Sequence, residues 1–221
     1  ATLPVTLDDF PVLETTGEGS VRGKLGAYEI TGLIAHGGMG VVLKAWDPKL
    51  QRDVAIKVLM PALAANEKSK VRMVKEARAA AALDHENILP IHSIEDASSL
   101  PYIVMPLVAG QSLQARLASV EGTPLPLPEF YEIGSKIARG LEHAHAQGVV
   151  HRDIKPANVL LEQDGRRVWI TDFGLARVAS DPAQSLTGTI AGTPQFMAPE
   201  QFEGKNIDSR ADLFSLGCVL Y

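Results

Sequence analysis

His-Arg-Asp-Ile-Lys-Pro-Ala-Asn, residues 151–158, is the stretch that decides both the fold and the chemistry of this chain. It lies between two short apolar runs, at 149–150 and 159–161, so its polar side chains are expected to gather on one tight loop. In such a loop Asp153 can orient a hydroxyl group and accept its proton, and Lys155 can neutralise a migrating phosphoryl group. Asn158 offers a neutral oxygen ligand for a hard cation.

A second polar motif, Asp172-Phe173-Gly174, follows the apolar run at 168–171. The runs at 159–161 and 168–171 flank Asp164-Gly165, a strong hairpin signal, which predicts that Asp172 returns close to Asn158. Mg²⁺ prefers one or two carboxylates together with phosphate oxygens and water. The alternative is a polar loop of chance composition.

A glycine-rich turn precedes these motifs. Ala35-His36-Gly37-Gly38-Met39-Gly40 lies between two predicted strands, and such a hairpin can turn its amide N–H groups toward phosphates. Taken alone, it is equally well explained as a plain tight hairpin.

Lys57 ends the apolar strand that begins at Val54. An unpaired buried ammonium is costly, so Lys57 requires an anion, which Glu76 on the following predicted helix or nucleotide phosphates can supply. The alternative is a lysine whose amine reaches water.

In this order the motifs, completed by Ala198-Pro199-Glu200, resemble the eukaryotic-like protein kinase family. The segment from Gly192 to Gln201 and the Gly37-Gly38-Met39-Gly40 turn look most like its bacterial serine/threonine branch. The resemblance covers residues 28–221.

The resemblance implies an α+β fold with two lobes. Residues 28–105 would form a small N-lobe with a five-stranded antiparallel sheet and one helix, after a flexible leader at 1–27. Residues 106–110 would form the hinge, and 111–221 a mainly helical C-lobe, truncated in its central helix. Without the helices that would cover that central helix, we expect residues 1–221 alone to be unstable or inactive.

The implied function is transfer of the γ-phosphoryl group of ATP to a serine or threonine hydroxyl of a protein. Asp153 would be the catalytic base, and Lys155 points to serine or threonine rather than tyrosine as the acceptor. Lys57 would hold the α- and β-phosphates and pair with Glu76.

The implied cofactors are ATP and Mg²⁺, with Mn²⁺ as an alternative cation. Asn158 and Asp172 would hold the metal. Adenine would lie between Val42 and Ala55 on one side and Leu160 on the other. The full set of residues expected around the nucleotide is Ile34, Ala35, Gly37, Gly38, Gly40, Val42, Ala55, Lys57, Met105, Val108 and Leu160.

Regulation by autophosphorylation, with dimerisation as one route, is a further implication. Arg152 would bind a phosphate on the long segment that follows Asp172, and Thr193 would shape the acceptor site and contact Asp153. The candidate phosphorylation sites are Ser185, Thr187 and Thr189.

Ala35 departs from the family pattern, which has a glycine here. If the position requires positive φ or a close approach, alanine costs on the order of 1 kcal/mol.

The composition bears on the class of binding partner and on the cellular compartment of the protein. A net charge of -5 and a pI near 5.7, without a long Lys/Arg block, argue against nucleic acid. The single cysteine, Cys218, excludes a disulfide within the chain and suits a reducing cytoplasm. No apolar run approaches the roughly 18 residues of a membrane span, so we expect a cytoplasmic kinase domain, in a parent protein that is either soluble or membrane-anchored.

Two other functions fit parts of the pattern. A pseudokinase that acts as a scaffold predicts the loss of Lys57, Asp153 or Asp172, all of which are present. A small-molecule phosphotransferase of the antibiotic-kinase type shares the catalytic Asp and Asn but generally lacks the segment at 192–200.

Overall fold

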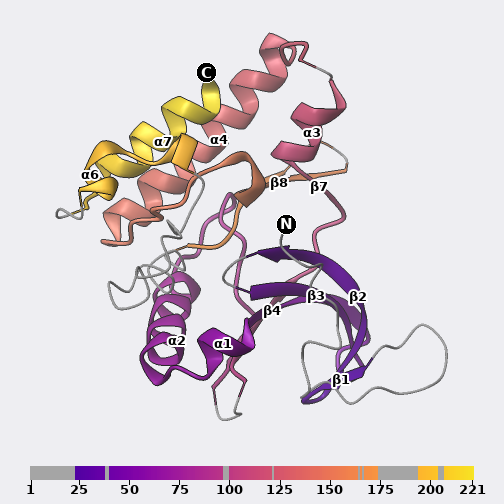
Figure 1. Ribbon diagram of the computed structural model, residues 1–221. Coiled ribbons are helices and arrows are strands. Elements are labelled where there is room, and N and C mark those ends of the chain that lie inside the picture. The colour runs from indigo at the N-terminus through magenta and orange to yellow at the C-terminus, as the bar shows by residue number, and fades with distance from the viewer. Residues whose placement is uncertain are drawn as a thin grey trace. The chain divides into compact units, whose positions relative to one another are not determined.

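The computed structural model, shown in Figure 1, describes residues 23–37, 40–96, 100–120, 122–163, 165, 167–173, 194–203 and 207–221. The chain forms two compact units. The first contains residues up to Lys75 together with Ile91–Leu107, and the second contains Glu76–Pro90 and Val108–Tyr221. This division runs through helix α2 (Glu67–Ala81), whereas the boundary predicted from the sequence follows residue 105.

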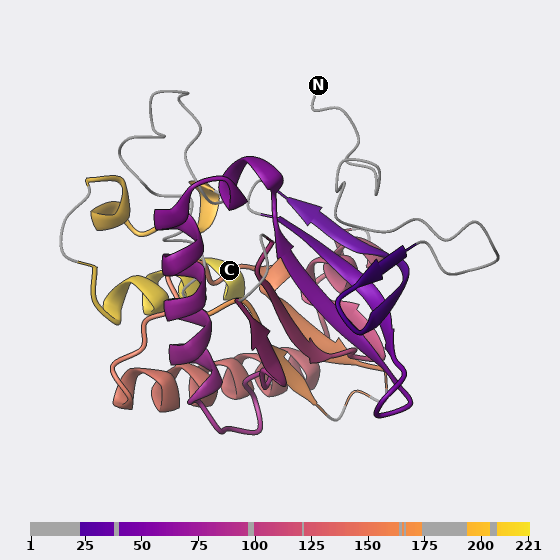
Figure 2. The ribbon, with the colours of Figure 1, turned by 90° about the horizontal axis from the view of Figure 1, so that it is seen from below.

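The first unit is built on one antiparallel sheet with the strand order β1-β2-β3-β4-β6-β5, and the predicted α+β class is confirmed. Figure 2 shows the curl of this sheet. Its strands are β1 (Gly23–Leu25), β2 (Tyr28–Gly37), β3 (Gly40–Asp47), β4 (Arg52–Leu59), β5 (Ser93–Glu95) and β6 (Tyr102–Pro106), and the short helix α1 (Pro61–Ala64) precedes α2.

The sheet has six strands rather than the predicted five, because β1 arises inside the stretch predicted as a leader. Leu25 is buried, and the turn that follows places Gly26 at φ 59°. A Cβ at Gly26 would overlap the Tyr102 hydroxyl, so this turn requires glycine for its conformation and for space. The Tyr102 ring also packs edge-on against Tyr28, with centroids 6.2 Å apart.

The burial of β3 and β4 follows their sequences. In β3, Val41, Leu43 and Ala45 are buried and alternate with half-buried residues, as a strand with one core face requires. In β4 every residue from Val54 to Leu59 is buried, because this strand pairs with β3 on one side and β6 on the other.

The second unit is mainly helical and carries a small sheet of order β7-β8-β9. Helices α4 and α7 lie side by side in Figure 1 and contact each other. The elements are β7 (Gly110–Ser112), α3 (Leu113–Ser119), α4 (Leu127–Ala146), the 3₁₀ helix η2 (Pro156–Asn158), β8 (Val159–Glu162), β9 (Val168–Ile170), the 3₁₀ helix η4 (Pro194–Phe196), α6 (Pro199–Phe202) and α7 (Arg210–Leu220).

Helix α4 buries one apolar stripe of its surface. Ile137, Leu141 and Ala144 recur at helical spacing and are buried. The helix ends in a Schellman motif, in which Gly148 has φ 74° and donates to His145 O, while Val149 N donates to Ala144 O.

Two apolar runs of the sequence form less strand than their composition suggests. The run at 88–94 contributes only the bridge between Ile88 and Ile170 before β5 begins at Ser93, and the pair at 149–150 forms no strand. Among the described residues, no helix is both long and apolar enough to cross a bilayer.

Candidate active site

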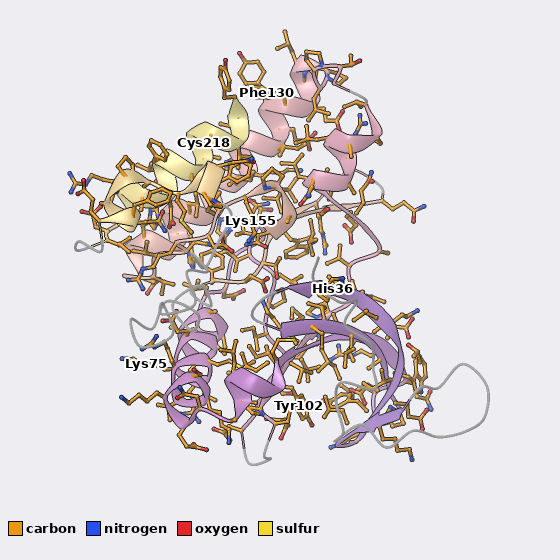
Figure 3. All side chains as sticks on the ribbon, in the orientation of Figure 1. His36, Lys75, Tyr102, Phe130, Lys155 and Cys218 are labelled. Atoms are coloured by element: carbon orange, nitrogen blue, oxygen red, sulfur yellow. The ribbon has the colours of Figure 1, made fainter. Side chains whose placement is uncertain are left out.

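The loop from His151 to Asn158 is shaped by alternation between buried and polar residues. Ile154 is buried in the second unit, so its neighbours on either side, Asp153 and Lys155, turn the other way. Lys155 has extended backbone (φ −158°), and Pro156 then opens η2 at the position where a missing N–H does not matter. The local sequence therefore brings the two charged side chains onto one side of the loop. Lys155 is labelled in Figure 3.

The Asp153 carboxylate is held by two partners within this loop. Lys155 Nζ lies 2.7 Å from Asp153 Oδ2, and the side chains of Lys155 and Asp153 are 18% and 10% exposed. Asn158 Nδ2 donates to the same oxygen at 3.1 Å and to the Asp153 backbone carbonyl at 2.8 Å. The structure thus brings together three of the predicted site residues.

Asp172 enters the same region of the second unit from strand β9. Thr171, the residue before it, donates its N–H to Asn158 O at 3.0 Å, and Thr171 O lies 2.8 Å from His151 Nε2. Asp172 has φ 70°, a left-handed conformation that is uncommon outside glycine. The ring of Phe173 is buried and packs on His151, with centroids 4.6 Å apart. Contacts from both sides therefore fix the backbone on either side of Asp172.

The donor chemistry at this place fits a hard divalent cation. Asn158 uses its amide nitrogen for both hydrogen bonds to Asp153, an orientation that assigns its oxygen Oδ1 as the atom to offer a metal. Asp172 supplies a carboxylate in the segment tied to Asn158. Among the described residues there is no cluster of three or more His, Cys, Asp or Glu side chains. An amide oxygen and a carboxylate are ligands that a hard divalent cation accepts beside phosphate oxygens and water.

Asp212, at the start of α7, anchors the backbone before Asp153, and this residue is absent from the sequence-based site. Its fully buried carboxylate accepts hydrogen bonds from His151 N at 2.8 Å and from Arg152 N at 2.7 Å, and His145 Nε2 lies 2.7 Å from Oδ2. An aspartate inside an otherwise apolar predicted helix is the signal that could have revealed it, since a buried charge needs partners.

The pKa of Asp212 reflects opposing effects. Burial raises it, whereas the hydrogen bond with His145, the electrostatic interaction with His151 and the backbone N–H groups of Arg152 and His151 lower it. The hydrogen bonds prevail, so the pKa of Asp212 lies below its ordinary value and the carboxylate is ionised near neutral pH.

The first unit places four of the predicted nucleotide-binding residues on one face of its sheet. Val42 is directly opposite Lys57, and Ala55 is directly opposite Met105. Directly paired residues of antiparallel strands point to the same face, and Ala55 and Lys57 are two apart on β4, so these four side chains share a face. Lys57 is 8% exposed.

The glycine-rich turn joins β2 to β3. A Cβ at Gly40 would overlap the Val58 carbonyl oxygen, so no larger residue fits there without moving the backbone. Ala35 pairs with Val42 as an ordinary strand residue and is not in the positive-φ region, so the conformational cost expected of alanine at this position does not arise. Ile34, at the bulge in β2, is 47% exposed.

The predicted contacts that join residues of the two units, such as the pair of Lys57 with Glu76, stay predictions. Lys57 belongs to the first unit, whereas Glu76, Val108 and Leu160 belong to the second. The remaining predicted positions, Gly38, Ser185, Thr187, Thr189 and Thr193, lie outside the described residues.

Comparisons with known proteins agree with the motifs. The model of the protein kinase domain family matches residues 28–221. A probable serine/threonine-protein kinase of Streptomyces coelicolor, SCO3848, is 41% identical over 202 residues, and the serine/threonine-protein kinase PknD of Mycobacterium tuberculosis is 39% identical over 200. These alignments cover 89% and 90% of this chain but 30% of each relative, so the chain spans about a third of their length.

A solved structure supports the same relationship. The kinase domain of Mycobacterium tuberculosis PknI superposes with a TM-score of 0.74 and 30% sequence identity, covering 92% of this chain and 76% of that one. The family uses ATP and a divalent metal ion. The chain therefore belongs to the protein kinase domain family, and its relatives place it in the bacterial serine/threonine-protein kinase branch.

Proposed function

We propose that this chain is the catalytic part of a serine/threonine-protein kinase, which transfers the γ-phosphoryl group of Mg-ATP to a hydroxyl group of a protein. The observation that carries this proposal is the cluster of Asp153, Lys155 and Asn158, in which one carboxylate oxygen receives both a lysine amine and an asparagine amide. The names of the related proteins support the same activity.

In the proposed reaction, Asp153 acts on the acceptor hydroxyl. Its Oδ2 is engaged by Lys155 and Asn158, so we assign Oδ1 to the hydrogen bond that orients the hydroxyl and accepts its proton. Lys155, 2.7 Å from this carboxylate, would neutralise charge on the phosphoryl group as it moves toward the hydroxyl oxygen. Holding these groups in place before the reaction is the main contribution a protein makes to phosphoryl transfer.

Asn158 Oδ1 and the Asp172 carboxylate would hold Mg²⁺, with Mn²⁺ as an alternative. The metal would screen the phosphate charges when it is bound. In the first unit, Lys57 would bind the α- and β-phosphates, and the sheet face that carries Val42, Ala55 and Met105 would provide apolar contacts for adenine. The family resemblance further implies that Lys57 pairs with Glu76, which belongs to the second unit.

Regulation belongs to the same proposal. Arg152 would bind a phosphate introduced at Ser185, Thr187 or Thr189, since a phosphate adds about −1.5 to −2 charges that an arginine can pair with. Dimerisation would allow one copy to phosphorylate another, and the cytoplasm would supply ATP.

The test combines activity with substrate class. The intact protein is incubated with γ-labelled ATP and Mg²⁺ and is offered a general protein substrate and an aminoglycoside in parallel. We expect label on serine and threonine of the protein substrate, loss of transfer when the metal is chelated, and no label on the aminoglycoside. A protein that binds ATP without transferring phosphate would be a pseudokinase, and label on the aminoglycoside alone would indicate a small-molecule phosphotransferase.

A further inference from the structure

We infer that Gln201 is a positioning residue for phosphoryl transfer, because it holds the peptide that precedes Asp153 in the orientation the reaction needs. The inference rests on the proposed function of Asp153 and adds a residue outside the catalytic loop. Gln201 lies on α6, 48 residues after Asp153 in sequence.

Both the oxygen and the nitrogen of the Gln201 side-chain amide form hydrogen bonds. Its Nε2 donates to the Arg152 carbonyl oxygen at 2.9 Å, and its Oε1 accepts from Ala198 N, also at 2.9 Å. The second bond satisfies an N–H at the start of α6 and orients the amide. With the oxygen committed to Ala198, the nitrogen is the end that faces Arg152.

The carbonyl group that Gln201 binds is the one that directly precedes Asp153. Arg152 O belongs to the same planar peptide unit as Asp153 N, so fixing this oxygen fixes the plane from which Asp153 emerges. Asp153 N in turn donates to His151 Nδ1 at 3.2 Å. Arg152 itself has φ 68°, which is unfavourable for a residue with a Cβ and persists only where surrounding contacts enforce it.

Two hydrogen bonds, one on each side of Arg152, hold this residue at its positive φ. Its N–H donates to Asp212 Oδ1 at 2.7 Å, and its carbonyl accepts from Gln201. Asp212 does not contact the peptide after Arg152, whose N–H donates to His151 Nδ1 at 3.2 Å and whose carbonyl is held by Gln201 at 2.9 Å. The amide of Gln201 acts on that second peptide.

The segment that carries Gln201 is anchored on the same helix as the loop. Ser215 Oγ donates to Phe196 O at 2.7 Å, which ties η4 to α7, and Asp212 precedes Ser215 by three residues on that helix. Both side chains are buried. Helix α7 is thus connected to Arg152 in two ways: directly by the hydrogen bond to Asp212, and indirectly through Ser215, the 194–203 segment and Gln201. A shift of the 194–203 segment would therefore move the peptide before Asp153.

Replacing Gln201 by glutamate tests this geometry with almost no change in shape. An ionised carboxylate can still accept from Ala198 N, but its other oxygen would face Arg152 O and repel it. A protonated carboxyl can donate to Arg152 O as the glutamine amide does. The activity of Gln201→Glu should therefore depend on pH in a way that the wild type does not.

The experiment measures kcat and KM for ATP across pH in the intact protein. At pH 8 we expect Gln201→Glu to lose about 10- to 100-fold in kcat, because the half-buried hydrogen bond to Arg152 O is replaced by repulsion, with KM for ATP unchanged. The deficit should shrink as pH falls and the new carboxyl gains its proton. Gln201→Leu should lose a similar factor at every pH, and Gln114→Glu, on an exposed position of α3, should follow the wild type.

A second measurement does not depend on activity. Hydrogen exchange of the 151–158 peptide should be faster in Gln201→Leu than in the wild type or Gln114→Glu. If the wild type transfers no phosphate, the proposed function fails, and this exchange rate still decides the inference. Wild-type exchange in Gln201→Leu, or a Gln201→Glu variant with the wild-type kcat and pH profile, would overturn it.

Discussion

Removing the Asp212 carboxylate should destabilise the protein more than any other single charge change in α7. In Asp212→Ala, the backbone N–H groups of His151 and Arg152 lose their acceptor in the interior. An unsatisfied buried donor costs about 1–3 kcal/mol, so two of them cost about 2–6 kcal/mol. A domain has about 5–15 kcal/mol of stability in total, which makes this loss a large share.

The matched control is Asp208→Ala, four residues earlier. The Asp208 side chain is 52% exposed and pairs with Arg210 at 3.0 Å, an arrangement that typically contributes little because water replaces the lost partner. Both variants are compared with the wild type by urea unfolding at neutral pH. Equal midpoints for Asp212→Ala and Asp208→Ala would refute the view that the buried carboxylate organises the catalytic loop.

Three further predictions follow from the structure. Gly40→Ala should lower the free energy of unfolding by about 1–3 kcal/mol, because its Cβ would overlap the Val58 carbonyl oxygen; an unchanged urea midpoint would contradict this. The pKa of Asp212 is lower in the folded protein than in the unfolded chain. The carboxylate therefore adds its full contribution to the free energy of unfolding above about pH 4, the pKa of an aspartate in the unfolded chain, and this contribution is lost as pH falls through the folded pKa. Unfolding curves between pH 6 and pH 2 should therefore show an acid-dependent loss that is smaller in Asp212→Asn, and identical curves would contradict the assignment. Asn158→Ala should raise the Mg²⁺ concentration needed for half-maximal transfer, measured by metal titration at saturating ATP, and an unchanged requirement would remove Asn158 from the metal site.

The catalytic loop could be predicted from the sequence because its chemistry is contiguous. Asp153, Lys155 and Asn158 lie within six residues, and alternation around one buried isoleucine is enough to bring them together. The approach of Asp172 could also be predicted, since a short hairpin returns the chain to Asn158.

The supports of the loop could not be predicted in the same way. Asp212 and Gln201 lie about 50 to 60 residues from the backbone groups they bind, and no local spacing indicates such a contact. Strand β1 was missed for a different reason. It is three residues long, and its turn depends on the space beside the Tyr102 hydroxyl, which only the folded sheet defines.

The proposed role of Asp153 is tested most directly by single-turnover transfer from γ-labelled ATP in the intact protein, comparing the wild type with Asp153→Asn. Asparagine keeps the shape of the side chain but cannot accept the hydroxyl proton. We predict that the transfer rate falls about 10²- to 10⁴-fold while ATP affinity stays near the wild-type value. Transfer by Asp153→Asn at the wild-type rate would contradict the assignment of this carboxylate as the group that activates the acceptor.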